Sequence, residues 1–127
     1  MYCERPPAST EGTLVLELPA GLDDRRRLLH WYGSALKFPA YYGANWDALA
    51  DCLRDLGWLP ERTIHLHHSA LPLAAARDEL ATYLGLLMEV QQSWKPGEAH
   101  QVRISFVPGC HDEVKALLTA DSANGAG

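Results

Sequence analysis

The chain has 127 residues, of which 47% are hydrophobic and 21% charged, a composition typical of one globular domain with a workable core. Its formal net charge of −5 argues against a general nucleic-acid-binding protein, which needs a basic surface, and suits a basic protein partner. No apolar run approaches the length of a membrane span, and the N-terminus lacks the apolar core of a secretory signal. We therefore expect a cytoplasmic protein whose three cysteines are reduced.

Strands and helices are expected to alternate along the chain. Apolar residues at every second position predict strands at residues 13–18, 63–67 and 101–107. Helical spacing of apolar residues predicts a helix capped by Asp23 or Asp24, a helix from Asn45 to about Leu56 with Gly57 as C-cap, and a long helix over residues 74–93. Residues 112–118 can form one more short helix.

This order of elements predicts the fold. Strands separated by helical crossovers favour a parallel sheet, because each crossover returns the chain to the end of the sheet where the previous strand began. We expect an α/β two-layer sandwich, in which helices pack mainly on one face of a three-stranded parallel sheet. The domain should span residues 12–109, between a flexible tail at residues 1–11 and a short helix and flexible tail at residues 110–127.

Three groups of side chains invite a chemical interpretation and also have a simpler one. His65, His67 and His68 resemble metal ligands, but no further ligand follows at a suitable spacing, and partly exposed histidines are the default. Cys52 is read as a small buried hydrophobe rather than a reactive thiol. We expect neither a metal nor another cofactor. The basic run at residues 25–27 is expected to be a solvated helix face paired with nearby carboxylates.

The most informative stretch is YYGANWDALADCL, residues 41–53. Asn45 is a good N-cap, since its side-chain oxygen can accept from the first free N–H groups of a helix. Behind it, Asp47, Asp51 and Asp55 recur every four residues and form one acidic stripe, whose neighbouring charges repel by roughly 0.2–0.5 kcal/mol per pair. A cationic partner would relieve this repulsion, although an acidic stripe is also the usual solvated face of a helix.

This stretch resembles the signature of the barstar family, intracellular protein inhibitors of small microbial ribonucleases. The resemblance implies a non-catalytic protein that inserts an acidic loop and helix into a ribonuclease active site. It assigns the partner contacts to the following residues: Tyr41, Tyr42, Gly43, Ala44, Asn45, Trp46, Asp47, Ala50, Asp51 and Glu89. Asp51 matches the family aspartate that projects into the nuclease site, and Asp47 matches the acidic contact one turn earlier.

The chain also departs from the family pattern. Ala50 stands where the best-known members have a tryptophan, Ala44 stands where an acidic residue is common, and Trp46 replaces an aliphatic residue. The expected partner is a secreted or toxin-type ribonuclease with a basic cleft, with no direct contact to nucleic acid or membrane, and the chain alone is expected to be a monomer. Two alternatives stay open: a barstar-like module for a non-nuclease partner, and a small enzyme that uses Cys52 or the histidines.

Overall fold

The computed structural model describes residues 12–39, 42–95, 97–110 and 112–117, and it confirms the predicted order of elements. That order is β1 (Thr13–Leu18), α1 (Arg25–Ala35), α2 (Trp46–Asp55), β2 (Thr63–His68), α3 (Arg77–Ser93), β3 (Gln101–Phe106) and a 3-10 turn, η1 (Pro108–Cys110). Residues 112–117 are helical as well. None of the helices that the structure describes has the length and apolar character that a membrane span requires.

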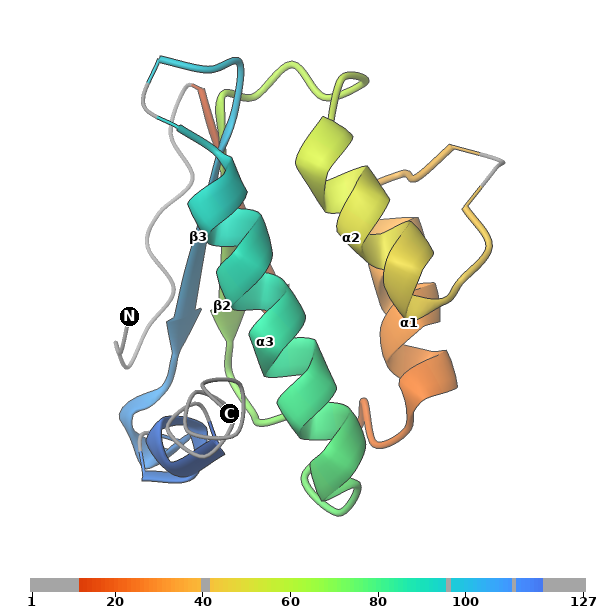
Figure 1. Ribbon diagram of the computed structural model, residues 1–127, viewed down its shortest axis with the longest axis vertical. Coiled ribbons are helices and arrows are strands. Elements are labelled where there is room, and N and C mark those ends of the chain that lie inside the picture. The colour runs from red at the N-terminus through yellow and green to blue at the C-terminus, as the bar shows by residue number, and fades with distance from the viewer. Residues whose placement is uncertain (1–11, 40–41, 96, 111, 118–127) are drawn as a thin grey trace, which may run out of the picture.

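The three strands form one parallel sheet with β2 in the middle. Thr13 is in register with Thr63, and Thr63 is in turn in register with Gln101. The helices α1, α2 and α3 lie on the same side of this sheet (Figure 1). The predicted fold class, a two-layer α/β sandwich with a three-stranded parallel sheet, is therefore confirmed.

The core lies between the sheet and these helices. The inward-facing side chains of β2 and β3 alternate with outward-facing ones, as a strand requires. They meet the apolar stripes of the helices in one continuous cluster. The largest fully buried aliphatic and aromatic side chains are Leu18, Leu28, Leu29, Tyr32, Leu36, Leu49, Leu53, Leu56, Ile64, Leu66, Tyr83 and Phe106.

A chain of hydrogen bonds crosses this core from α1 to the sheet. The hydroxyl oxygens of Tyr32 and Tyr83 lie 2.6 Å apart, and that of Tyr83 lies 2.6 Å from Nε2 of His68. Nδ1 of His68 donates to the carbonyl oxygen of Ser105 at 3.0 Å, so Nε2 must be the acceptor. Tyr32 therefore donates to Tyr83, which donates to His68. Burial lowers the pKa of His68 to about 4, which keeps this imidazole neutral.

The histidines of β2 correct one prediction. His67 and His68 are fully buried rather than partly exposed, and His65 is half-buried. On the face of the sheet away from His68, the hydroxyl of Ser105 lies 2.8 Å from Nε2 of His65 and 2.7 Å from Nδ1 of His67. A hydrogen bond to at least one ring nitrogen of each imidazole lowers the cost of burying it.

Two helix boundaries also differ from the prediction. The long helix begins at Arg77 rather than at residue 74, because Ala76 has a ψ of 73°, which no right-handed helix accommodates. At the end of α2, Leu56 rather than Gly57 adopts the left-handed C-cap conformation, with a φ of 54°. Leu56 is fully buried, so the burial of its side chain offsets the cost of this conformation.

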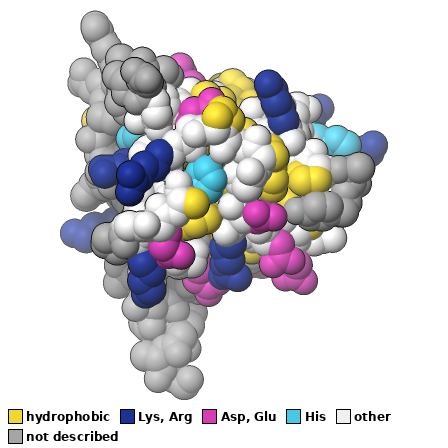
Figure 2. All heavy atoms as spheres, turned by 90° about the horizontal axis from the view of Figure 1, so that it is seen from above, with side chains coloured by type: hydrophobic (Ala, Val, Ile, Leu, Met, Phe, Trp, Pro, Cys, Tyr) yellow, Lys and Arg dark blue, Asp and Glu magenta, His cyan; other side chains and the backbone are white. Residues whose placement is uncertain are grey.

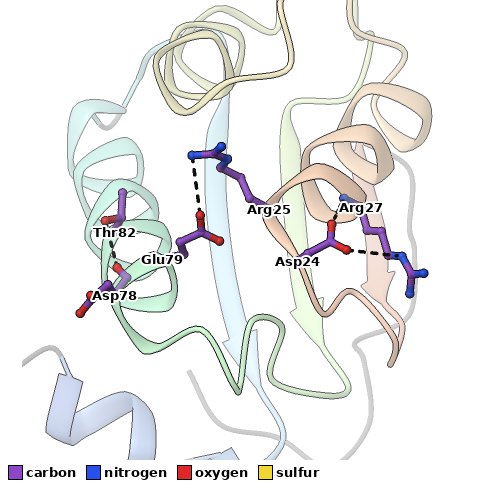
Figure 3. Close-up of polar contacts among 6 residues, drawn as sticks. All are labelled: Asp24, Arg25, Arg27, Asp78, Glu79 and Thr82. Carbon is purple, nitrogen blue, oxygen red and sulfur yellow. Dashed lines mark hydrogen bonds and ion pairs between the residues drawn. The ribbon is translucent and has the colours of Figure 1, made fainter.

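The basic run at the start of α1 pairs with carboxylates, as predicted. Arg25 points across to Glu79 of α3 at 3.6 Å, and Arg27 lies 3.6 Å from Asp24 (Figure 3). Asp24 is also the N-cap of α1 and accepts from the backbone N–H of Arg27. These side chains are largely exposed, so each ion pair stabilises the fold only weakly.

Candidate partner-binding site

The helix α2 begins as the sequence predicts. Asn45 is its N-cap, and its side-chain oxygen accepts from the backbone N–H of Ala48 at 2.8 Å. Leu49, Cys52 and Leu53 are buried on the inner face, while Asp47 and Asp51 are exposed on the outer face. Asp47 lies in the first turn, where the helix dipole favours a negative charge. The local sequence therefore turns both carboxylates outward on one helical stripe.

A groove of about 630 Å³ runs between α2 and α3 beside these carboxylates. Its walls come from two helical faces, with the lining residues recurring at intervals of three or four. They are Trp46, Asp47, Ala50, Asp51 and Arg54 of α2, and Ala81, Thr82, Gly85, Leu86 and Glu89 of α3. Ala50, Ala81 and Gly85 carry little or no side chain, which leaves space between the helices. The groove is therefore a product of tertiary packing.

The charges around the groove are not equivalent. Among the described residues, neither Asp47 nor Asp51 has an ion-pair partner. Glu89 projects from α3, with its side chain 73% exposed, and lies 3.5 Å from Arg54 of α2. The groove thus has two carboxylates open to a partner and a third already paired across it. Seen end-on, acidic side chains gather with basic ones along one side of the molecule (Figure 2).

The third member of the acidic stripe has a local role. Asp55 does not line the groove, and its side chain accepts from the backbone N–H of Gly57 at 3.2 Å. This bond helps to complete the turn after α2. The stripe that can face a partner along the groove therefore consists of Asp47 and Asp51.

The loop residues before α2 divide into outward and inward positions. Tyr41 lies outside the described residues. Tyr42 turns inward: its hydroxyl donates to the carbonyl oxygen of Leu29 at 2.8 Å. Gly43 is exposed, and Ala44 is half-buried with a φ of 51°. The structure therefore places Tyr42 as a support of the loop. Of the two neighbours Tyr42 and Gly43, only Gly43 is exposed.

Trp46 fills the space at the start of α2. It is half-buried against the core, and its ring centroid lies 6.1 Å from that of Tyr83. It also lines the groove. This position allows Trp46 both to pack against the core and to contact a partner.

The remaining candidates for chemistry do not form a reactive site. Cys52 is 1% exposed, and burial raises the pKa of its thiol, with Asp51 and Asp55 acting in the same direction. The prediction of a buried structural cysteine is thus confirmed. In the described part of the chain, no three His, Cys, Asp or Glu side chains are grouped closely enough to hold a metal ion.

Comparison with known families decides the classification. Residues 14–107, about three quarters of the chain, match the family model described as "Barstar (barnase inhibitor)". The chain belongs to the barstar family. Family membership implies binding to a ribonuclease partner in general terms. Comparisons with curated proteins and with solved structures gave no significant match.

Within this barstar-family domain, sequence reasoning missed half of the groove. It proposed Glu89 on α3 but not Ala81, Thr82, Gly85 or Leu86, and it overlooked Arg54. The small residues at positions 81 and 85 of α3 lie four apart in the sequence, and this spacing could have indicated a helix face that leaves room for a groove. Their partner helix could not be identified from that spacing.

Proposed function

We propose that this protein inhibits a small basic ribonuclease by covering its active site with the acidic loop and helix at residues 41–51. The observation that carries the proposal is the pair of exposed carboxylates, Asp47 and Asp51, beside the groove of a barstar-family domain. The protein would be non-catalytic, of the immunity or antitoxin type, cytoplasmic, and a monomer when alone. Its partner would be a secreted or toxin-type nuclease.

The chemistry of such a partner explains why carboxylates suit the site. A ribonuclease must bind phosphate, so its active site presents Arg, Lys and His side chains. Asp47 and Asp51 can take the positions of phosphate oxygens and accept charge-assisted hydrogen bonds from these cations. Truncating one side of a desolvated charge pair at an interface costs about 2–5 kcal/mol. Much of this cost comes from the charge that is left unpaired.

Affinity capture from the lysate and culture medium of the source organism tests the proposal. Wild-type protein is compared with an Asp47→Ala, Asp51→Ala double variant, and the captured proteins are identified by mass spectrometry. The control is an Asp23→Ala, Asp78→Ala variant, because both residues are exposed, neither lines the groove, and the change in net charge is the same. A small basic nuclease should bind the wild type and the control but not the Asp47/Asp51 variant.

The result also separates the two candidate functions. Association with a basic nuclease should slow as the salt concentration rises, since its rate depends on opposite charges. Capture of the same proteins by the wild type and by both variants would contradict the inhibitor function. A captured partner without a basic contact surface would favour a barstar-like binding module for a protein other than a nuclease.

A further inference from the structure

The segment that leads into α2 has a backbone conformation that the chain would not adopt by itself. Ala44 has a φ of 51° and Lys37 a φ of 53°. Both values lie in the left-handed region, where the Cβ atom of any residue other than glycine is crowded. Such conformations persist only where surrounding contacts impose them. Contacts with α1 and with the turn after α2 hold this segment.

Tyr42 provides the first set of contacts. Its hydroxyl donates to the Leu29 carbonyl oxygen, and its backbone N–H donates to the Pro39 carbonyl oxygen at 3.0 Å. Its ring lies against α1 at Gly33, where a Cβ atom would be only 3.1 Å from the ring. Burial raises the pKa of Tyr42 to about 12, so the hydroxyl stays a donor at neutral pH. Gly33, a poor helix former inside α1, is thus explained by the space that this ring needs.

Phe38 and Trp58 complete the arrangement. The ring of Phe38 meets that of Tyr42 edge-on at a centroid distance of 4.7 Å, and that of Trp58 edge-on at 5.8 Å. The indole N–H of Trp58 donates to the carbonyl oxygen of Leu36 at 2.8 Å. This carbonyl belongs to the C-cap of α1. The end of α1, the segment before α2 and the turn after α2 are thereby joined by three packed rings.

We propose that Phe38, Tyr42 and Trp58 form an aromatic clamp that positions residues 42–45 and the first turn of α2 for the partner. The inference rests on the proposed function of that site. The clamp residues lie against α1 and not on the partner-binding surface. They fix Asn45, the N-cap, and so set the direction in which the Asp47 side chain leaves the helix. A segment that is already ordered loses less conformational entropy on binding, so the clamp would strengthen the complex without touching the partner.

Amide hydrogen exchange on the free protein tests the positioning directly. Tyr42→Phe removes only the hydroxyl, and exchange at the backbone amides of Tyr42 and Ala48 should become about tenfold faster, as expected for the loss of one partly buried hydrogen bond. Gly33→Ala should speed exchange at the same amides by displacing the ring, although alanine is the better helix former. Global stability is followed by urea unfolding in parallel.

The control is Trp94→Phe. Like Trp58, Trp94 donates its indole N–H to a backbone carbonyl oxygen. Its acceptor is Leu53 at 2.9 Å, near the C-terminal end of α2 and away from Asn45. This variant should lose comparable global stability while exchange at Tyr42 and Ala48 stays as in the wild type. Equal exchange at these amides in the wild type and in both clamp variants would overturn the inference. So would faster exchange of the same size in Trp94→Phe.

A binding measurement links the clamp to function. With the nuclease captured by the wild type, Tyr42→Phe and Gly33→Ala should bind about tenfold more weakly, and Trp94→Phe as the wild type does. Faster exchange with unchanged affinity would refute a role of the clamp in partner binding. If the wild type captures no nuclease, the proposed function fails, and the exchange measurements alone decide whether the clamp positions the segment.

Discussion

The buried imidazole of His68 makes the stability of the fold depend on pH in a defined range. Its pKa is about 4 in the folded protein against 6.5 for an ordinary histidine, because burial disfavours the charged form. The unfolded chain therefore binds a proton at higher pH than the folded chain does. The stability due to neutral His68 is fully present above about pH 6.5 and is lost as the pH falls toward 4.

The size of this effect follows from the two pKa values. Relative to neutral pH, His68 should reduce the free energy of unfolding by about 2 kcal/mol at pH 5 and by about 3 kcal/mol at pH 4. Burial also lowers the pKa of His65 and His67, so these residues add to the same trend. Against a total stability of roughly 5–15 kcal/mol, the loss is large enough to shift an unfolding transition clearly.

Urea unfolding of the wild type and of His68→Gln, followed by far-UV circular dichroism between pH 7.5 and 5, measures the effect. The variant should be less stable at pH 7.5, because a glutamine cannot reproduce both hydrogen bonds of the imidazole. Its stability should nevertheless fall by about 2 kcal/mol less than that of the wild type between pH 7.5 and 5. Parallel pH profiles for the two proteins would refute the assignment of a neutral, buried His68.

Three further predictions concern single side chains. Ala44→Gly should raise the free energy of unfolding by about 0.5 kcal/mol, because the backbone strain removed at a φ of 51° exceeds the entropic cost of a more flexible unfolded chain. A lower free energy of unfolding in urea would contradict this. Tyr83→Phe should lower it by about 1–3 kcal/mol by leaving Nε2 of His68 without its donor, and an unchanged urea midpoint would speak against the hydrogen-bond chain. In a Cys3→Ser background, Cys52 should react with a thiol reagent at pH 7.5 only after unfolding, and fast labelling of the native protein would show that it is accessible.

The fold was largely predictable because its signals are local. The strand over Thr13–Leu18 was predicted with the bounds that the structure shows, since alternating apolar residues and the following Pro19 mark it independently of its neighbours. The start of α3 was not, because alanine favours a helix and nothing in the local sequence marks the non-helical backbone of Ala76, whose ψ is 73°. Nor did the sequence indicate that His68 is buried, since its partners, Tyr83 and Ser105, lie on other elements.

The site was predictable only where one helix determines it. The four-residue interval between Asp47 and Asp51 is enough to place both carboxylates on one exposed stripe. The groove needs α2 and α3 side by side, and no periodicity says which helix faces which. Tyr42 shows the same limit: its residue type fits a contact with the partner, but the direction of its ring is set by Gly33 on α1.

The strictly parallel sheet has a consequence for how the protein folds. Each strand pairing joins distant residues: 50 positions separate Thr13 from Thr63, and 38 separate Thr63 from Gln101. Contacts of such long sequence separation form slowly, because a large loop must close before each pairing contributes. The helix α2 comes before two of the three strands, so a nascent chain carries it before the three-stranded sheet can support it. On the ribosome, the surface formed by α2 and α3 can therefore assemble only after most of the domain has been synthesised.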